Sequence, residues 1–348
     1  MQAFSHFLER ALQTIAPRRL LRTFPKHSRE NRWFRSQTAA FVVSLLWAGI
    51  RHRPDLVISS HANFLPAARL LKRLCGTPYI GVAHGIEVWG NQRPALRGAL
   101  QAADLTLCVS RYTRDRVGAE QGIPSERLSV LPNTFDAPRF VPGPKSAVLL
   151  ARYALPPQAR VIFTFGRLSA SERYKGFDRV IAALPAIRQQ VPDAYYLIGG
   201  SGDDRPNLER LAHEAGVAAW VRFAGFIPAH ELCAHYQLCD VFAMPSTGEG
   251  FGIVFLEAMA CGKPVLAGNR DGSVEPLADG RFGALVDPLD IGQIATTLSD
   301  ILSGRHVHPL MFQSEELRRQ VVAEFGFDRF CARLSTALAR VTTPSSSA

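Results

Sequence analysis

Two carboxylates flank a glycine-rich entry to an apolar segment: Glu249 lies within Gly248–Gly252, and Glu257 lies inside Ile253–Cys261. Because the latter run is otherwise apolar on every side, it predicts a buried helix. A carboxylate in such a helix is costly unless something hydrogen-bonds it. The glycines before the helix let backbone N–H groups approach a ligand, and the helix dipole favours a phosphate there. A sugar nucleotide would satisfy both groups, with hydroxyls for the carboxylates and a diphosphate for the amides.

Two cations follow an apolar strand candidate, residues 161–165. Arg167 comes directly after it, and Lys175 stands eight residues later, next to Gly176. Ligands of open parallel sheets bind at the carboxyl ends of strands, where Arg and Lys can hold a diphosphate. Alone, the pair is more commonly two exposed surface cations. A nearby run, 199–204, loosely resembles a dinucleotide fingerprint but lacks the third glycine and the spacing, so we interpret it as a tight turn near the nucleotide.

His84 ends another strand candidate, residues 79–82, and precedes Gly85. A lone histidine at such a place is more often a hydrogen-bonded structural residue. If two sheets face each other, it points into a cleft opposite Glu249 and donates to a sugar hydroxyl.

Short apolar strands alternate with helical stretches along the whole chain, which predicts an α/β protein of two doubly wound parallel-sheet domains. The strand candidates are 56–59, 79–82, 105–109, 128–131, 161–165, 194–198, 221–223, 241–244 and 264–267. The proline-rich segment 138–144 suits the connection between the domains.

Composition indicates a globular chain: its 348 residues are 47% hydrophobic and 20% charged. Its six cysteines form no C-x-x-C pair, which favours reduced core thiols in the cytosol over disulfides or a zinc site. We find no signal peptide at the first residues. The longest apolar run, 39–50, is too short to cross a bilayer and predicts a core helix.

The net charge of +10 is concentrated in one half of the chain. Residues 1–150 contain 21 Lys and Arg against 9 Asp and Glu, and the remainder is slightly acidic. The first 35 residues interleave arginines with apolar residues. Such an element either rests on an anionic membrane surface or exposes a basic helix face while its apolar side packs in the core. We do not expect nucleic-acid binding, because no recognised motif accompanies the charge.

These residues together resemble the retaining family 4 glycosyltransferases of the GT-B fold, over about residues 55–330. The resemblance rests on the order of several motifs: His84-Gly85, Val109-Ser110, Leu131-Pro132-Asn133, Gly166-Arg167-Leu168, Lys175-Gly176, Phe223–Phe226, Met244-Pro245-Ser246, Glu249, Glu257 and Asp271-Gly272-Ser273. It implies two facing Rossmann-like domains with an interdomain cleft: an acceptor-side domain 1–142 and a nucleotide-sugar-binding domain 143–327. A C-terminal helix at about 328–343 is envisaged as packing back on the first.

The resemblance also implies roles for particular residues. Arg167 and Lys175 would bind the donor diphosphate, and Glu257 the ribose. Glu249, with the backbone of Gly250, Phe251, Gly252 and Ile253, would hold the donor sugar, and His84 would face that sugar from the other domain. The backbone around Gly225, Phe226 and Ile227 would contact the base. His84, Glu249, Arg167 and Lys175 are thus the expected catalytic residues, with no metal and no cofactor.

The implied activity is transfer of a sugar from a nucleotide-sugar donor to an acceptor hydroxyl with retention of configuration. The expected acceptor is a lipid-linked sugar or glycan in cell-surface polysaccharide or glycolipid assembly, and the expected location is the cytoplasm, peripherally on the inner face of the membrane. Two alternatives remain: a nucleotide-sugar epimerase or hydrolase of the same fold, and a non-catalytic nucleotide-binding, membrane-associated protein.

One departure from the family pattern concerns the start of the chain. Family members begin with a strand and a glycine-rich loop, whereas residues 1–5 here fit inside the helix that should follow. We interpret this as a start codon assigned too late, with a genuinely shortened and weakened protein as the alternative.

Overall fold

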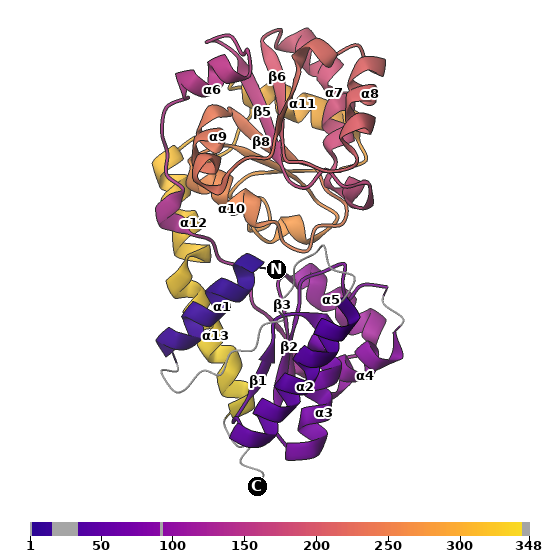
Figure 1. Ribbon diagram of the computed structural model, residues 1–348. Helices are drawn as coiled ribbons and strands as arrows, with labels where there is room; N and C mark the ends of the chain where they lie inside the picture. Colours follow the sequence, from indigo (N-terminus) through magenta and orange to yellow (C-terminus); the bar gives the residue numbers. More distant parts are fainter. Residues whose placement is uncertain (1, 16–33, 91–92, 343–348) are drawn as a thin grey trace. The chain divides into compact units, whose positions relative to one another are not determined.

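The computed structural model describes residues 2–15, 34–90 and 93–342 (Figure 1). The chain divides into two compact units. Unit 1 consists of residues 1–133 and 327–348, and unit 2 of residues 134–326.

Unit 1 is built on a four-stranded parallel sheet in the sequential order β1-β2-β3-β4. Its strands are β1 (Val57–Ser59), β2 (Tyr79–Ala83), β3 (Leu105–Cys108) and β4 (Leu128–Val130). The helices are α1 (Gln2–Ile15), α2 (Phe34–His52), α3 (Leu65–Cys75), α4 (Pro94–Ala102), α5 (Arg111–Gln121) and α13 (Phe327–Thr342), with short 3-10 turns η1 (Ala62–Phe64) and η2 (Ser125–Arg127). All four strands lie where the alternation of apolar segments predicts them.

The apolar side of the N-terminal helix α1 lies in the core of unit 1. Phe4, Phe7 and Leu8 are buried together with Phe330 and Leu334 of α13, against one face of the sheet. The opposite face is covered by α3, α4 and α5 (Figure 1). For residues 2–15 the structure therefore favours a core-packed helix over a membrane-inserted one. The basic residues between 16 and 33 lie outside the described part of the chain.

The second helix corrects one expectation. The run 39–50 forms most of α2, but this helix is not in the core: Val43, Trp47 and Ile50 are 65%, 65% and 52% exposed. It packs on α3, where Gly49 lies against Leu71. Contact on only one side explains why an apolar sequence remains at the surface. No helix in the described ranges combines the length and apolarity needed to span a membrane.

Unit 2 contains a six-stranded parallel sheet in the order β10-β9-β8-β5-β6-β7. The strands are β5 (Arg160–Phe165), β6 (Ala194–Gly199), β7 (Val221–Gly225), β8 (Val241–Met244), β9 (Val265–Gly268) and β10 (Ala284–Val286). Five of them match predicted strands. The sixth, β10, has only three residues and no distinct apolar run, so the sequence did not reveal it.

Helices cover both faces of this second sheet (Figure 1). They are α6 (Ala147–Arg152), α7 (Phe177–Gln190), α8 (Arg205–Glu214), α9 (Leu232–Leu238), α10 (Ile253–Ala260), α11 (Ile291–Leu302) and α12 (Ser314–Phe325), with 3-10 turns η3 (Ala137–Arg139), η4 (Ala170–Lys175), η5 (Ala218–Trp220), η6 (Ala229–Glu231) and η7 (Gly272–Val274).

We predicted from the sequence that residues 134–142 belong to the first domain, but in the structure they are part of unit 2 and are hydrogen-bonded to it. Arg318 of α12 donates to the carbonyls of Ala137 and Phe140, and the Phe140 ring packs edge-on against Tyr236 at 5.8 Å. These contacts, rather than the proline content of 138–144, determine which unit the segment joins.

The strand order of unit 2 contains a reversal at β5. From β5 the chain continues to β6 and β7 on one side, then returns to β8 on the other side of β5 and continues outward to β9 and β10. In open α/β sheets, ligands bind outside the carboxyl ends of the strands at this kind of reversal. The loops after β5 and β8 are therefore where a ligand of unit 2 is expected.

Candidate functional site

The carboxyl ends of three neighbouring strands bring the candidate residues of unit 2 together. Arg167 follows β5, Glu249 follows β8, and Asp271 follows β9. Two of these ends, those of β5 and β8, border the reversal in strand order.

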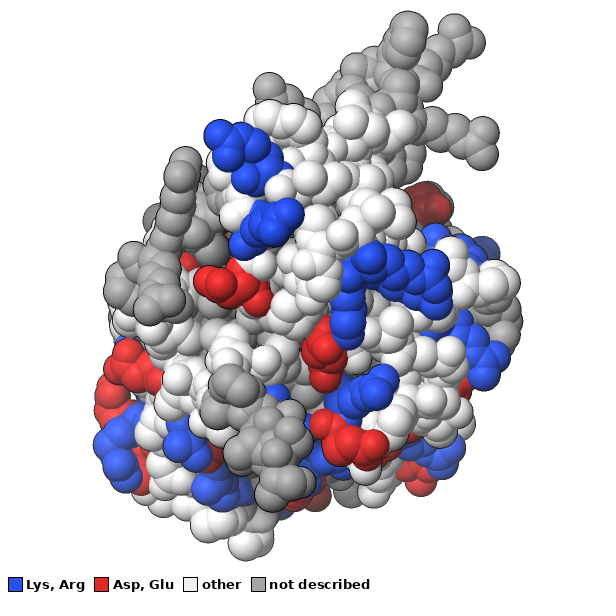
Figure 2. All heavy atoms as spheres, turned by 90° about the horizontal axis from the view of Figure 1, so that it is seen from below, with Lys and Arg blue, Asp and Glu red and all other residues white. Residues whose placement is uncertain are grey.

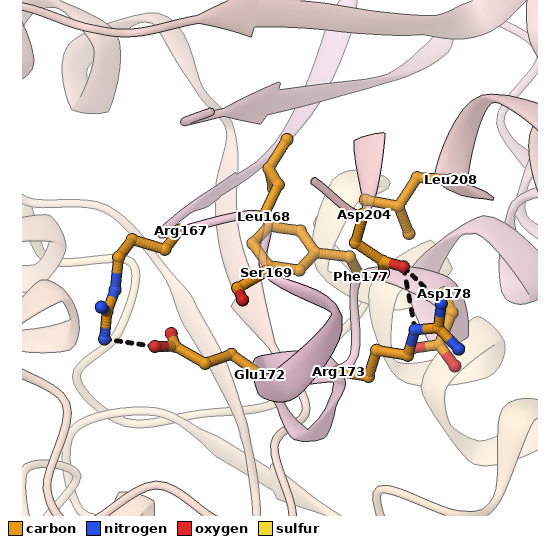
Figure 3. A pocket seen from close by; sticks show the side chains of 9 residues that line it. All are labelled: Arg167, Leu168, Ser169, Glu172, Arg173, Phe177, Asp178, Asp204 and Leu208. Atoms are coloured by element: carbon orange, nitrogen blue, oxygen red, sulfur yellow. Dashed lines mark hydrogen bonds and ion pairs between the residues drawn. The ribbon is translucent and has the colours of Figure 1, made fainter. Parts of the chain in front are cut away.

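Arg167 and Lys175 are joined through a third residue, Glu172. One carboxylate oxygen of Glu172 pairs with the Arg167 guanidinium and the other with the Lys175 ammonium. Figure 3 shows Arg167 and Glu172 pointing toward each other beside a small pocket. The Lys175 side chain is only 11% exposed and that of Glu172 5%, whereas Arg167 is 65% exposed. Sequence reasoning missed Glu172, although a carboxylate three residues before the lysine was a readable signal.

The turn that carries these cations is tied to the Glu249 loop. Thr247 N donates to the Tyr174 carbonyl at 2.8 Å, and the Arg179 guanidinium donates to the Pro245 carbonyl at 2.8 Å. Between η4 and α7, Gly176 has a φ of +79°, and a Cβ at that position would lie 2.4 Å from the Pro245 oxygen. The cations and the glutamate are thus positioned by one interlocked pair of loops.

Asp271 holds the backbone of the Glu249 loop. Its carboxylate is 2% exposed and accepts from Glu249 N at 2.7 Å, Ser246 Oγ at 2.7 Å and Ser273 N at 2.9 Å. The following residue, Gly272, donates from its N to the Glu249 carbonyl at 2.9 Å. The sequence placed Asp271 in a family motif, but its function as the support of this loop comes from the structure.

Glu249 itself is half-buried, and burial raises the pKa of its carboxyl. The nearby Lys175 opposes that rise, whereas the negative charges of Asp271 and Glu172 add to it. The carboxyl group is therefore within electrostatic reach of both the cation and its counter-ion. Just beyond it, Gly252 has a φ of +89° and forms the N-cap of α10, as the glycine-rich entry predicts.

Glu257 finds a partner within the protein. The hydroxyl of the fully buried Tyr236, on α9, donates to Glu257 Oε2 at 2.7 Å. Burial raises the pKa of Glu257 to about 7, and the tyrosine hydrogen bond opposes that rise. Sequence reasoning predicted that this carboxylate needs a partner but did not find Tyr236, which lies on a different helix.

The segment predicted to contact a base begins at Gly225, the last residue of β7. Gly225 has a φ of +69°, the Phe226 side chain is 77% exposed, and Ile227 is buried. Gly200, after β6, donates from its N to the Gly225 carbonyl at 2.8 Å. This backbone link, with a φ of +127° at Gly200, makes 199–202 the tight turn that the sequence indicates.

His84 belongs to unit 1, at the end of β2. Its ring Nε2 lies 3.0 Å from the Ser60 carbonyl and its ring packs edge-on against Phe4 at 4.9 Å. Burial lowers the pKa of His84, so the ring is neutral near pH 7. Because a carbonyl can only accept, this contact assigns the proton to Nε2 and leaves Nδ1 as an acceptor. The structure thus assembles the other candidates in unit 2 and holds His84 separately in unit 1.

Among the residues that the structure describes, no group of three or more His, Cys, Asp or Glu side chains could hold a metal ion.

Two family profiles match this chain. The profile described as "Glycosyl transferases group 1" matches residues 149–320, and that described as "Glycosyltransferase Family 4" matches residues 4–139.

Curated relatives are similar in sequence. A protein of Mycolicibacterium smegmatis named GDP-mannose-dependent alpha-(1-6)-phosphatidylinositol monomannoside mannosyltransferase is 40% identical over 67% of this chain and 63% of its own length. A Mycobacterium tuberculosis protein of the same name is 34% identical over 84% of this chain and 75% of its own length. This chain thus spans somewhat less than two thirds of the first relative and three quarters of the second.

Solved structures share the fold. HepE of Anabaena in complex with UDP has a TM-score of 0.74 at 22% identity, covering 87% of this chain and 83% of that one. Sucrose-phosphate synthase of Thermosynechococcus elongatus has a TM-score of 0.74 at 22% identity, covering 93% and 83%. Sequence and fold agree that this chain belongs to family 4 of the glycosyltransferases and has the GT-B fold.

Proposed function

We propose that this protein transfers a sugar from a nucleotide-sugar donor to an acceptor hydroxyl, with retention of anomeric configuration. The observation that supports this most directly is the pairing of Arg167 and Lys175 at the strand reversal of unit 2. A departing nucleoside diphosphate develops negative charge, and fixed cations in a preorganised site stabilise such charge. In this proposal no metal and no cofactor is needed.

The remaining candidates have complementary roles in the proposal. The backbone N–H groups of 250–253, at the start of α10, face the phosphate or the sugar, and Glu249 binds sugar hydroxyls. Glu257 accepts from the ribose, and the segment 225–227 contacts the base. His84 of unit 1 is kept in the proposal as a candidate for the sugar, with one correction: its Nε2 proton is directed at Ser60, so Nδ1 can accept a hydrogen bond rather than donate one.

The donor and acceptor are proposed from the relatives. Those proteins are named for GDP-mannose and phosphatidylinositol monomannoside, so GDP-mannose is the first donor to test and a mannosylated inositol lipid the first acceptor. UDP-glucose is the second donor, because HepE has been solved with it. A lipid-linked acceptor would place the reaction in glycolipid or cell-surface polysaccharide assembly.

We also propose that unit 1 docks on an anionic membrane surface, on the inner face of the cytoplasmic membrane. Helices α2 and α3 together expose Val43, Trp47, Ile50, Leu70 and Leu74, at 42% to 65%. Exposed arginines Arg51, Arg53 and Arg73 lie on or next to the same two helices. Figure 2 shows Lys and Arg groups, and smaller Asp and Glu groups, separated by uncharged surface. Exposed apolar side chains and arginines on the same two helices suit a membrane interface rich in anionic lipid.

The first test of the activity is turnover with each donor and with vesicles containing the inositol lipid. We expect released GDP and a mannosylated lipid whose new linkage has the α configuration of the donor, measured by NMR. Free mannose without transfer, or an epimerised donor, would instead support the hydrolase or epimerase alternative.

Substitutions then test the diphosphate site. Lys175→Ala and Arg167→Ala should each lower kcat/KM by about 100-fold or more, as expected when a preorganised donor to the developing charge is lost. The control is Arg173→Ala on the same turn, whose side chain is 56% exposed and pairs instead with Asp204. Unchanged kcat/KM for the lysine and arginine variants would contradict the proposal.

A further inference from the structure

We propose that Glu172 is an internal counter-ion of the donor site. Its carboxylate pairs with the two diphosphate-binding cations when no ligand is bound, and its charge limits the affinity of these cations for a nucleoside diphosphate. This rests on the proposed function, since it takes Arg167 and Lys175 as the groups that bind diphosphate. Neither the sequence motifs nor the relatives assign a role to this residue.

The geometry is that of one anion shared by two cations. Glu172 Oε1 contacts Arg167 and Oε2 contacts Lys175, so the carboxylate spans the pair as a diphosphate would. The neighbouring Arg173 takes no part, because its guanidinium donates twice to Asp204 Oδ1, at 2.6 and 2.9 Å. Figure 3 shows the Arg167–Glu172 pair and the Arg173–Asp204 pair as two separate ion pairs that line the same pocket.

Burial makes the shared pairing necessary in the absence of a ligand. With their side chains 5% and 11% exposed, Glu172 and Lys175 are largely removed from water. An unpaired charge in such a place is strongly unfavourable. Glu172 therefore pairs with the lysine and holds its side chain in place until an anionic ligand arrives.

The same charge opposes the ligand. A diphosphate that contacts Arg167 and Lys175 must lie close to Glu172, and like charges a few ångströms apart in a partly buried site repel. Affinity is lowered for the donor and for the diphosphate product alike. In many enzymes product release limits turnover, and a weaker hold on the product hastens that step.

The backbone conformation at Glu172 differs from that of the rest of its turn. Glu172 lies in η4, a 3-10 turn interrupted at this residue, where φ is −119° and ψ is 24°. A change confined to Glu172 would withdraw its carboxylate from the cations without moving Lys175, which ends the same turn.

The test is the affinity of the full-length protein for GDP, UDP and inorganic pyrophosphate, measured by titration calorimetry on Glu172→Gln. Glutamine keeps the size and one acceptor oxygen but removes the charge. We expect GDP and pyrophosphate to bind about tenfold more tightly, and kcat to fall while KM for the donor also falls. Glu172→Asp, which keeps the charge, should bind GDP within about twofold of the unmodified protein.

The matched control is Asp204→Asn, which makes the same carboxylate-to-amide change in the same pocket but at the Arg173 pair. It should leave GDP affinity unchanged. Equal or weaker GDP binding by Glu172→Gln, in a variant whose melting temperature shows that it is folded, would overturn the inference. If Lys175→Ala also leaves GDP affinity unchanged, the proposed diphosphate site fails as well; if only Glu172→Gln has no effect, that site stands and the inference alone falls.

Discussion

Glu257 is a carboxylate whose ionisation depends strongly on its buried surroundings. It lies on α10 among buried apolar residues, and Tyr236 donates to one of its oxygens. Desolvation penalises the charged form more than this hydrogen bond stabilises it, which is why the pKa of Glu257 rises to about 7. Near neutral pH the group is thus poised between a hydrogen-bond donor and an acceptor for a bound hydroxyl.

This raised pKa has a consequence for stability. In the unfolded chain the pKa is near 4.5, so between about pH 4.5 and 7 the folded state binds more protons. The contribution of Glu257 to the free energy of unfolding is therefore full below that window and is lost as pH rises through 7. Glu257→Gln should remove this loss. The difference in the free energy of unfolding between the variant and the unmodified protein should therefore shift by about 2 kcal/mol in favour of the variant when the pH is raised from 5 to 8.

Urea unfolding at the two pH values measures this difference. Glu214→Gln, at a side chain 56% exposed on α8, is the control and should show no such difference. A variant and parent with parallel stability curves would show that Glu257 is not protonated in the folded state.

At the scale of elements, the site depends on loops that approach each other too closely for side chains. Gly176 approaches the Pro245 carbonyl, and Gly272 approaches the Gly250 carbonyl, where a Cβ would lie 2.2 Å from the oxygen. These contacts fix η4, the turn that ends at Lys175, and η7 against the Glu249 loop. The positions of the chemical groups therefore depend on backbone packing as much as on hydrogen bonds.

Gly176→Ala tests this packing against a glycine of similar conformation. Gly216 has a φ of +69° and no atom within 4 Å of the place where a Cβ would lie, whereas Gly176 has a φ of +79° and the Pro245 oxygen at 2.4 Å. Alanine at either position costs about 1 kcal/mol for the left-handed backbone. Gly176→Ala alone should lose about 2 kcal/mol more than this, because its Cβ clashes with the Pro245 carbonyl. It should also lose donor turnover. Equal losses in the two variants, measured by urea unfolding, would show that the loops relax freely.

The largest feature to test is the membrane docking proposed for the surface of unit 1. If α2 and α3 dock on lipid, Trp47→Ser should weaken co-flotation with vesicles of phosphatidylcholine and phosphatidylglycerol by about tenfold, since each large apolar side chain that leaves water contributes roughly 1.5 kcal/mol or more. Leu289→Ser, at a residue 58% exposed in unit 2, is the control and should float normally.

Vesicles of phosphatidylcholine alone, and rising salt, test the charge component. Binding should be weaker in both conditions, because screening and the absence of anionic lipid remove the attraction to the arginines. Flotation that Trp47→Ser leaves intact would exclude α2 as the docking helix.

Much of the fold could be predicted from the sequence because its signals are local. Apolar runs alternating with helical stretches indicated nine of the ten strands found in the described residues, and the glycines around Glu249 indicated the start of α10. The burial of α2 was mispredicted, since apolarity alone does not say how many sides of a helix find a neighbour.

Residue type and spacing along the chain were enough to predict the two parallel-sheet halves, the family resemblance and the candidates Arg167, Lys175, Glu249 and Glu257. What those four residues contact became visible in the folded chain alone. Asp271 lies 22 positions from Glu249, and Tyr236 lies 21 positions from Glu257. Such contacts form because the sheet brings the ends of separate strands and helices together. Residue periodicity along the chain does not indicate which of these ends become neighbours.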